Sequence, residues 1–509
     1  MYKVNRSWLT DNKDELPKTA YLKLTNLMNS IQEGNDTVIL SPIAKRDGWD
    51  NIREDWIKFY SSLDKSNWPD ALIEMEESQQ DKLGPRSIAK PWSEVRKSVY
   101  DYFESSSGKL VCNDSVLSPF KTAGMRVLRP LSTEQTIQRI KKSTSSGLPF
   151  VTRKGDVIAV TMSDSMKALS RFWPAAMYER TQEQGKTRVV WGIALGQILR
   201  EAPFFFPLLK RMSDSPWLSA LLGPEAVDIA MDRLIKYAIL NDLSIVTIDF
   251  SRFDTTVKGS LMDCSWEVIR NFFQPSYSGD LDSIESDFRN VGILCPDGLV
   301  SGEHGIPSGS MFTNIVGSIS HAVASLSTEL VDINLSQILG DDGVHLVRSE
   351  SVDEFLDSFE QLGMIVNKEK SLTSDRYSIF LQKLFHPDIN VNGQIKGVYP
   401  INRGFNRLCN MERYDNFKLD GISGADYFAI RDLSIMENSK YHPAFREYVL
   451  WWASKSKYPG IPSDKGIRDY VERISDFNGT EGILVNQYGD NIRGIKTWKS
   501  YQILSEESA

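Results

Sequence analysis

The segment that most restricts the fold is Ile338-Leu339-Gly340-Asp341-Asp342-Gly343-Val344-His345-Leu346-Val347. Two short apolar runs flank a Gly-Asp-Asp-Gly turn, which is typical of a β-hairpin because glycine permits the positive φ of a tight reversal. Asp341 and Asp342 stand side by side at its tip. Adjacent carboxylates repel unless a cation lies against them, and hard divalent cations prefer oxygen ligands. A solvated hairpin tip is equally compatible with this segment taken alone.

A second apolar run ends in an acid, Asp249, which lies 92 positions before Asp341. Residues 243–248 are apolar and β-branched, and this pattern predicts a buried strand that ends at Asp249. Asp254 follows five residues later, where the chain should be leaving the strand. An acid at a strand end and an acid at a hairpin tip are placed to hold cations between adjacent central strands. The alternative is that Asp249 caps a helix or forms an Asx-turn.

Between these acids lies a hydroxyl-rich loop at residues 301–310. The next residues predict a helix, because Met311, Ile315, Ile319 and Val323 recur with helical spacing. Loop amides and hydroxyls at a helix start can hydrogen-bond a sugar or a phosphate. An ordinary Pro-Ser-Gly turn with a capping serine explains the same residues.

A further helix is predicted from residue 351 to a stop at Gly363. Ser351-Val352-Asp353-Glu354 has the spacing of a capping box. Lys368 and Lys370 follow this helix. They form either a solvated charge cluster or, at one position, a lysine able to donate a proton to a leaving group.

The bulk composition is that of a folded globular protein with several subdomains. The chain has 509 residues, 41% hydrophobic and 25% charged, which exceeds the usual size of a single core. Its net charge of −8 argues against a nucleic-acid partner, but the basic residues are concentrated. Residues 121–154 hold eight basic side chains against one acid, and residues 167–211 hold eight against three. This distribution predicts a phosphate-binding channel, although solvated faces are the simpler explanation.

Cysteine and histidine usage gives no sign of a zinc site. The four cysteines and five histidines are scattered through the chain, which argues against a disulfide framework and favours a reducing, intracellular environment. The chain has neither an 18-residue apolar run nor a signal-peptide core at its N-terminus, so we expect a soluble protein. The cysteines are Cys112, Cys264, Cys295 and Cys409.

In order and spacing, these segments resemble the conserved motifs of viral RNA-dependent RNA polymerases. The resemblance covers residues 140–390. The amino-acid sequence of residues 305–313 is most similar to that of the polymerases of picobirnaviruses and partitiviruses, which are double-stranded RNA viruses. Asp249 and Asp254 match motif A, Ser308-Gly309 with Thr313 match motif B, and Gly340-Asp341-Asp342 match motif C. Lys370-Ser371 match motif D, and residues 379–385 match motif E. Gly185-Lys186-Thr187-Arg188 match motif F, and Ser145-Ser146-Gly147-Leu148-Pro149 match motif G.

The resemblance implies a mixed α+β fold in the form of a right hand with fingers, palm and thumb, closed by fingertips. The implied domains are an N-terminal helical region bridging fingers and thumb (1–100), fingers (101–240, with 255–300 partly returning to them), a palm with motifs A to E (241–390), and a thumb with the C-terminal region (391–509). Helices are expected near 441–455 and 464–475.

The implied activity is template-directed RNA synthesis from ribonucleoside triphosphates by two-metal nucleotidyl transfer with release of pyrophosphate, serving transcription and replication of a viral RNA genome. Asp249 and Asp341 would be the essential metal ligands and Asp342 an auxiliary one. Lys370 would be the proton donor to pyrophosphate.

The resemblance also implies which residues contact substrate. Lys186 and Arg188 would neutralise the triphosphate, with Arg180 as a helper. Asp254, with Ser308 and Thr313, would recognise the ribose 2′-hydroxyl. The remaining implied contacts are Gly309 and Asn314 for the nucleotide, and Ser145, Ser146, Gly147, Pro149 and Lys383 for RNA.

One position departs from the family pattern. Many relatives carry an asparagine nine residues after the motif B serine, where it helps to orient the sugar-sensing aspartate. This chain has Gly317 there, with Asn314 and Ser318 nearby. The sequence therefore leaves open which residue assists Asp254.

The implied cofactors are two Mg²⁺ or Mn²⁺ ions, and the implied partners are RNA template and product, ribonucleotides and a viral capsid protein. A monomer without a membrane is expected, in the virion interior and the host cytoplasm. Two rival classes stay open, namely a reverse transcriptase or other two-metal enzyme and a non-enzymatic RNA-binding, capsid-associated protein. Template preference, initiation mode, metal identity, virus and host are not determined. The glycine-punctuated stretch 477–495 either supports the first nucleotide or is a surface hairpin.

Overall fold

The computed structural model describes residues 2–105, 108–121, 127–163, 172–414, 421–456, 460–478 and 492–508. The chain divides into two compact units. Unit 1 comprises Met1–Gly34, Pro91–Arg180 and Arg188–Phe380, and unit 2 comprises Asn35–Lys90, Thr181–Thr187 and Leu381–Ala509. The first hundred residues contribute to both units, while the boundaries expected for fingers, palm and thumb stay predictions.

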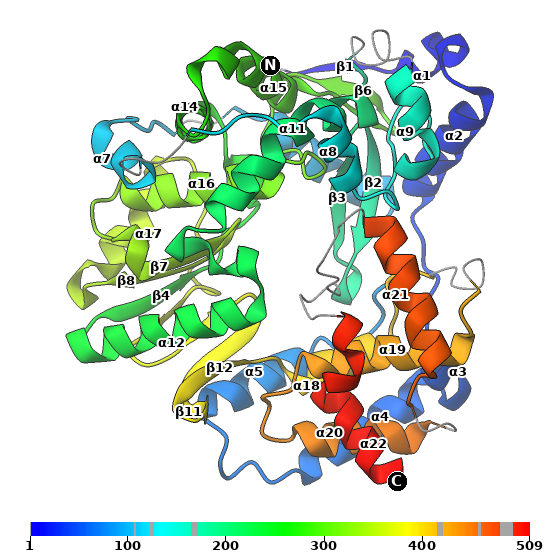
Figure 1. Ribbon diagram of the computed structural model, residues 1–509, viewed down its shortest axis with the longest axis vertical. Helices are drawn as coiled ribbons and strands as arrows, with labels where there is room; N and C mark the ends of the chain where they lie inside the picture. Colours follow the sequence, from blue (N-terminus) through cyan, green and yellow to red (C-terminus); the bar gives the residue numbers. More distant parts are fainter. Residues whose placement is uncertain are drawn as a thin grey trace. The chain divides into compact units, whose positions relative to one another are not determined.

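A four-stranded antiparallel sheet forms one part of unit 1, at the left of Figure 1. Its strand order is β7 (Ser336–Leu339), β8 (Asp342–Val347), β4 (Ser244–Ile248) and β9 (Leu372–Ser374). The predicted strand and hairpin are therefore confirmed. β4 is an interior strand, and its residues Ile245, Val246 and Ile248 are buried. Both edges of β4 are paired and helices cover the sheet, so most of its side chains lose solvent and its sequence is an apolar run.

Helices cover the four-stranded sheet from two sides. In Figure 1, α16 (Thr313–Leu326) and α17 (Val352–Gln361) lie above strands β7, β8 and β4, and α12 (Pro224–Asn241) lies below them. α16 is buried along nearly its whole length, from Ile315 to Ser325, so its apolar residues join the core on several sides.

The capping box predicted at residue 351 is wrong, although the helix begins where expected. Ser351 is the N-cap of α17, but its side chain makes no capping hydrogen bond. A 3₁₀ turn at Ser349–Ser351 precedes the helix and gives Ser351 a φ of −106° and a ψ of 3°. An N-cap side chain needs extended backbone at that residue to reach back to the helix amides.

A second sheet of five strands forms another core in unit 1. Its order is β1 (Lys3–Asn5), β6 (Gly298–Ser301), β5 (Ile293–Cys295), β2 (Ala175–Thr181) and β3 (Thr187–Gly192). The other elements of unit 1 are α1 (Trp8–Asp11), α2 (Lys18–Glu33), α6 (Trp92–Tyr100), α7 (Asp114–Leu117), α8 (Thr133–Arg139), α9 (Lys154–Ser163), α11 (Leu195–Met212), α13 (Phe253–Thr256), α14 (Gly259–Asn271), α15 (Ser278–Asn290) and β10 (Ser378–Phe380).

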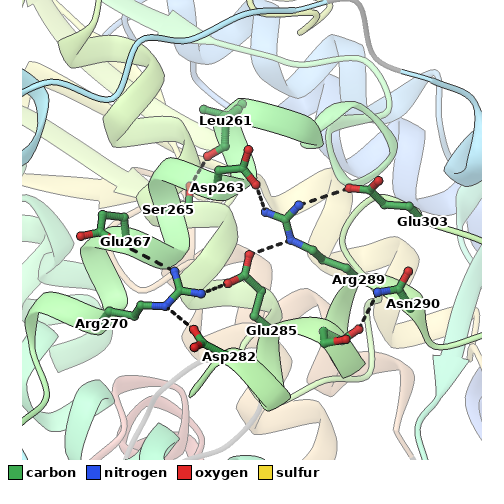
Figure 2. Close-up of polar contacts among 11 residues, drawn as sticks. Leu261, Asp263, Ser265, Glu267, Arg270, Asp282, Glu285, Arg289, Asn290 and Glu303 are labelled. Atoms are coloured by element: carbon green, nitrogen blue, oxygen red, sulfur yellow. Dashed lines mark hydrogen bonds and ion pairs between the residues drawn. The ribbon is translucent and has the colours of Figure 1, made fainter. Parts of the chain in front are cut away.

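Ion pairs join α14 to α15 in the segment between β4 and β5 (Figure 2). Arg270 of α14 pairs with Asp282 at 2.8 Å and with Glu285, both on α15. Glu285 also accepts from Arg289 at 2.8 Å. Because Glu285 lies between two guanidinium groups, the three side chains form one network that fixes the two helices side by side.

The expectation of no disulfide is wrong for one pair of cysteines. Cys112, just before α7, is bonded to Cys264 of α14, with 5.4 Å between their Cα atoms. The pair is separated by 152 residues, so spacing along the chain gives no hint of it. Cys295 and Cys409 are buried free thiols.

Unit 2 is mostly helical around an aromatic core. Trp56 of α4 stacks on Phe405 of α18 with 4.5 Å between ring centroids. The helices predicted near 441–455 and 464–475 are confirmed as α20 and α21. The elements are α3 (Pro42–Asp47), α4 (Trp49–Ser62), α5 (Asp70–Gln80), β11 (Lys383–Val391), β12 (Gln394–Val398), α18 (Ile401–Cys409), α19 (Gly424–Glu437), α20 (Phe445–Lys455), α21 (Asp464–Asn478) and α22 (Lys499–Ser508).

Most of the stretch 477–495 lies outside the described residues, so its predicted role stays a prediction. Across the helices that the structure describes, none combines the length and the apolar character needed to cross a bilayer.

The start of α18 depends on a buried acid from α5. Glu76 accepts hydrogen bonds from the backbone N–H of Ile401 at 2.6 Å and of Asn402 at 3.0 Å, so a carboxylate occupies the positive end of the helix. Glu76 also contacts the ring of His442 at 3.1 Å. We expect Glu76→Ala to lower the free energy of unfolding by ~2–3 kcal/mol, because it leaves buried amide donors unpaired.

Thermal and urea unfolding of the full chain measure this loss. The neighbouring Glu77 is exposed on the same helix, so Glu77→Ala is a matched control that should change stability little. Equal stability of the Glu76 and Glu77 variants would contradict the capping role.

Candidate active site

The candidate active site lies where the central strands end together. The register of β4 against β8 brings Asp249 level with Asp342, one residue beyond the last pair. β7 and β8 are joined by the two-residue turn of Gly340 and Asp341. Directly opposed residues of antiparallel strands lie about 5 Å apart, so the three carboxylates gather at one edge of the sheet. All three are exposed.

The two glycines of the turn have different roles, which corrects the expectation that both supply positive φ. Gly340 has a φ of 63° and Asp341 keeps a negative φ, the pattern of a type II′ turn. Gly343 does not have positive φ. A Cβ at Gly343 would lie 2.2 Å from Cε1 of His321, so glycine is required there for space.

Asp249 is held by the segment that follows α17. Its backbone N–H donates to Oγ of Ser371 at 3.1 Å, and its carbonyl accepts from the N–H of Asn367 at 2.7 Å. Lys370 lies between these contacts and is exposed. The backbone of the predicted proton donor is therefore attached to the end of the strand that carries the predicted metal ligand.

Charges from three separate motifs meet at Asp254, in α13. Burial and, to a smaller extent, the negative charge of Asp341 raise the pKa of its carboxyl, the positive charge of Arg188 lowers it, and the net result is a pKa of about 7. These effects require Asp254 to lie within electrostatic reach of both side chains. The structure thus brings the predicted motif A, C and F residues Asp254, Asp341 and Arg188 together.

The motif B loop is held against β3 and against the backbone of Asp254. The Oγ of Ser308 accepts from the backbone N–H of Trp191 at 3.1 Å. A Cβ at Gly309 would lie 1.8 Å from the Trp191 carbonyl oxygen, so the close approach requires glycine. Thr313 donates from Oγ1 to the Pro307 carbonyl at 2.6 Å.

A buried acid that the sequence did not indicate also fixes this loop. Glu201 of α11 accepts from Oγ of Ser310 at 2.9 Å, from the N–H of Met311 at 2.8 Å, and from Nε2 of Gln197 at 3.1 Å. Burial raises the pKa of the Glu201 carboxyl to about 7. The available signal was its position on the apolar face of the helix, one turn after Gln197.

Gly317, where the chain departs from the family pattern, lies beside the turn. A Cβ at this position would make ordinary contacts, 3.4 Å from the Phe253 ring and 3.6 Å from Cα of Gly340, so sterics alone do not require glycine there. Asn314, one turn earlier on α16, places its Nδ2 3.9 Å from where a Gly340 Cβ would lie. Asn314 is therefore a neighbour of the catalytic turn, consistent with its predicted place at the site.

The predicted template-entry residues form a tight turn in unit 1. Ser145 shares a hydrogen bond of 2.9 Å with the Tyr178 hydroxyl and accepts from the N–H of Gly147 at 3.2 Å. Ser146 is buried and binds the backbone of Thr152 and Leu195. The peptide bond before Pro149 is cis. Their contacts with RNA stay a prediction.

Two predicted residues belong to unit 2. Lys186 lies in the turn between β2 and β3, where the N–H of Gln182 donates to its carbonyl at 2.9 Å. Lys383 begins β11. Arg180 is exposed near the end of β2, in unit 1. The substrate contacts proposed for these three side chains stay predictions.

The residues at the sheet edge fit a divalent cation bound together with substrate. Within the described ranges, no group of three or more His, Cys, Asp and Glu side chains is arranged to hold a metal unaided. Mg²⁺ usually takes only one or two protein carboxylates, and water and phosphate oxygens complete its shell. Exposed Asp249 and Asp341 supply that number, and the charge of Asp341 also adds to burial in raising the pKa of Asp254.

An antiparallel sheet with carboxylates at its edge, a glycine-rich loop packed on β3 of the second sheet and an arginine within electrostatic reach of the acids define a palm-type nucleic-acid polymerase. A family model for viral RNA-dependent RNA polymerase matches residues 75–396. The chain belongs to this family and is an RNA-directed RNA polymerase with the mixed, right-hand fold.

Individual relatives agree with the family. The chain is 29% identical to the "Potential RNA-dependent RNA polymerase" of a human picobirnavirus, over 94% of this chain and 95% of that protein. It is 26% identical to the "RNA-directed RNA polymerase" of Cryptosporidium parvum virus 1, over 49% of this chain and 53% of that protein. The crystal structure of a human picobirnavirus RNA-dependent RNA polymerase matches with a TM-score of 0.81 at 26% identity, covering 95% of this chain and 96% of that one.

The raised pKa of Glu201 predicts how the free energy of unfolding changes with pH. Its carboxyl ordinarily titrates near 4.5 and in the folded chain near 7, so between these values only the folded state holds the proton. The free energy of unfolding should therefore fall by up to about 3 kcal/mol as pH rises through this interval. Glu201→Gln should lack this component.

The measurement is urea unfolding of the wild type and the Gln variant from about pH 5 to about pH 8. Glu225→Gln, at an exposed position of α12, is the control and should keep the wild-type slope. The same slope in the wild type and in Glu201→Gln would show that Glu201 titrates normally.

Proposed function

We propose that this polymerase copies an RNA template from ribonucleoside triphosphates by two-metal nucleotidyl transfer, in transcription and replication of a viral RNA genome. The observation that carries the proposal is the joint position of Asp249, Asp341 and Asp342 at one sheet edge, with Asp254 in the field of Asp341 and Arg188. In the reaction the primer 3′-oxygen forms a bond to the α-phosphorus, and the bond to pyrophosphate breaks.

Asp249 and Asp341 would hold the two divalent cations, with Asp342 as an auxiliary ligand. Bound there, the ions supply activation of the attacking hydroxyl and stabilisation of the leaving phosphate. Mg²⁺ and Mn²⁺ both suit oxygen ligands. The exposure of the carboxylates supports this assignment, because triphosphate and water must complete the coordination shell.

Arg188 would bind the triphosphate bidentately, and Lys186 and Arg180 would add positive charge. Lys370 would donate the proton that pyrophosphate needs on leaving. Its neighbours Asn367 and Ser371 both contact the Asp249 backbone, so the lysine is tied to the strand end where the reaction takes place.

Asp254, Ser308 and Thr313 would distinguish ribose from deoxyribose. Thr313 already donates its proton to a carbonyl, so its oxygen is left to accept from a 2′-hydroxyl. Ser308 accepts from Trp191 and keeps its own proton to donate. An ionised Asp254 would be a further acceptor for the 2′-hydroxyl. Gly309 and Asn314 would also contact the nucleotide.

Relatives from a human picobirnavirus and from Cryptosporidium parvum virus 1 support a role in a double-stranded RNA virus. The partners would be template, product RNA and a capsid protein, with the polymerase working as a monomer in the virion interior and the host cytoplasm. Ser145, Ser146, Gly147, Pro149 and Lys383 would contact RNA.

Asp249→Asn and Asp341→Asn should each reduce incorporation of labelled ribonucleotide on an RNA template about a thousandfold or more, because each removes a metal-binding charge. Asp342→Asn should retain more activity. Deoxyribonucleotide incorporation and RNA degradation, assayed in parallel, test the reverse transcriptase and nuclease alternatives. Asp353→Asn, an exposed acid of α17, is the control. Full activity of either essential variant with Mg²⁺ or Mn²⁺ would remove that residue from the mechanism.

Arg188→Ala and Lys186→Ala should raise the KM for nucleotide about tenfold, because each removes a charge-assisted contact to the triphosphate. Lys383→Ala, expected to contact RNA, should instead weaken RNA binding and leave this KM unchanged. Steady-state kinetics and a filter-binding assay separate the two effects. If the Arg188 and Lys186 variants altered only RNA affinity, those residues would belong to the template path.

A further inference from the structure

Two buried histidines lie directly beneath the catalytic turn. His321 of α16 and His345 of β8 have no exposed surface, and their Nε2 atoms are 3.1 Å apart. Nδ1 of His321 lies 3.1 Å from the Gly340 carbonyl oxygen. Nδ1 of His345 lies 3.0 Å from Oγ of Ser336, on β7. A continuous line of polar contacts therefore runs through the core and ends on the turn.

The chemistry of these groups allows one direction of donation. A carbonyl oxygen only accepts, so His321 must donate from Nδ1 to Gly340. A neutral His321 then offers Nε2 as an acceptor, so His345 donates from its own Nε2. Nδ1 of His345 is then an acceptor beside Ser336, whose single hydroxyl proton has two acceptors in reach, this Nδ1 at 3.0 Å and the Asp332 carbonyl at 3.1 Å. Burial lowers the pKa of His321 to about 4 and lowers that of His345 well below its usual range, so both rings stay neutral as this arrangement requires.

The rings pack among aromatic side chains, and the buried Ser325 adds one further polar neighbour, its Oγ lying 3.5 Å from Nε2 of His345. The His321 ring packs against Phe250 at 5.0 Å and Phe359 at 6.3 Å between centroids, and the His345 ring packs against Phe355 at 5.3 Å. In such an environment an unmade hydrogen bond is costly, so the contact to the turn is strongly maintained.

The carbonyl that His321 binds determines the type of turn. It belongs to the peptide between Gly340 and Asp341, the central peptide of the turn. Flipping this peptide converts a type II′ turn into type I′, which requires positive φ at the second central residue. Aspartate tolerates that conformation, so the turn sequence alone permits both types. Ser318 of α16 binds the other side of the glycine, accepting from its N–H at 2.9 Å.

We propose that His321 is a positioning residue for Asp341, and that its hydrogen bond to the Gly340 carbonyl, braced by His345, holds the catalytic turn in the type II′ form. The inference rests on the proposed role of Asp341 as a metal ligand. Gly343 is part of the same device, because any Cβ there would strike the His321 ring. Gly343 therefore leaves space for His321, which orients the peptide of Gly340.

The test compares His321→Asn with His321→Leu. Both side chains branch at Cγ and have similar size, but only the asparagine amide can replace the Nδ1–H donor. Leu should lower kcat about tenfold, whereas Asn should stay within about threefold of the wild type. The KM for nucleotide and the affinity for RNA should be unchanged in both, because the turn acts on the chemical step. Equal kcat values for Asn and Leu would overturn the proposal.

Hydrogen–deuterium exchange of residues 336–347, without metal or nucleotide, is a readout independent of activity. It should be faster in the Leu variant and close to wild type in the Asn variant. Full activity of Asp341→Asn would refute the metal-ligand role, while this exchange result would still report on the turn. A second pair of variants, at His345, serves if the His321 variants do not fold. His345→Gln keeps the Nε2 donor, whereas His345→Met removes it. The same order of kcat is expected for this pair, and equal kcat values for Gln and Met would overturn the bracing role of His345.

Discussion

The antiparallel pairing of β4 with β8 is the interaction on which the site depends. It joins two distant segments and sets a register in which Asp249 faces Asp342, 93 positions later in the chain. A shift of one residue in this register would turn every side chain of one strand to the opposite face. The interior position of β4 makes such a shift costly, because its apolar residues are buried between β8, β9 and the covering helices.

The same pairing concentrates negative charge. It gathers acids at one edge, and the charge of Asp341 adds to burial in raising the pKa of Asp254. Arg188, on β3 of the five-stranded sheet, offsets part of this charge. Under the function we propose, divalent ions and the triphosphate would neutralise each other as they fill the site, so such a cluster of acids would favour binding the two together.

Local patterns predicted much of the fold. The buried strand before Asp249, the hairpin at Asp341 and the helix after residue 351 depend on periodicity and turn chemistry, which act over a few residues. The role of Gly343 was misjudged because it depends on a helix 22 residues earlier in the chain, where His321 lies. The disulfide and the contacts of Glu201 likewise arise only when distant segments pack, and no spacing rule anticipates them.

The buried polar groups explain how exposed catalytic residues can be held accurately. An exposed carboxylate has no packing of its own to restrain it, so its position must come from the backbone that carries it. In this chain Glu201 binds the motif B backbone, and Ser318 and His321 bind the N–H and C=O of Gly340. Each is buried, where the low dielectric makes such hydrogen bonds strong and their loss costly. The buried positioning groups and the exposed acids are thus different residues. Helix α16 fixes the turn that carries Asp341, and α11 fixes the loop at Ser310 and Met311. In the function we propose, this division would leave the acids open to metal and nucleotide.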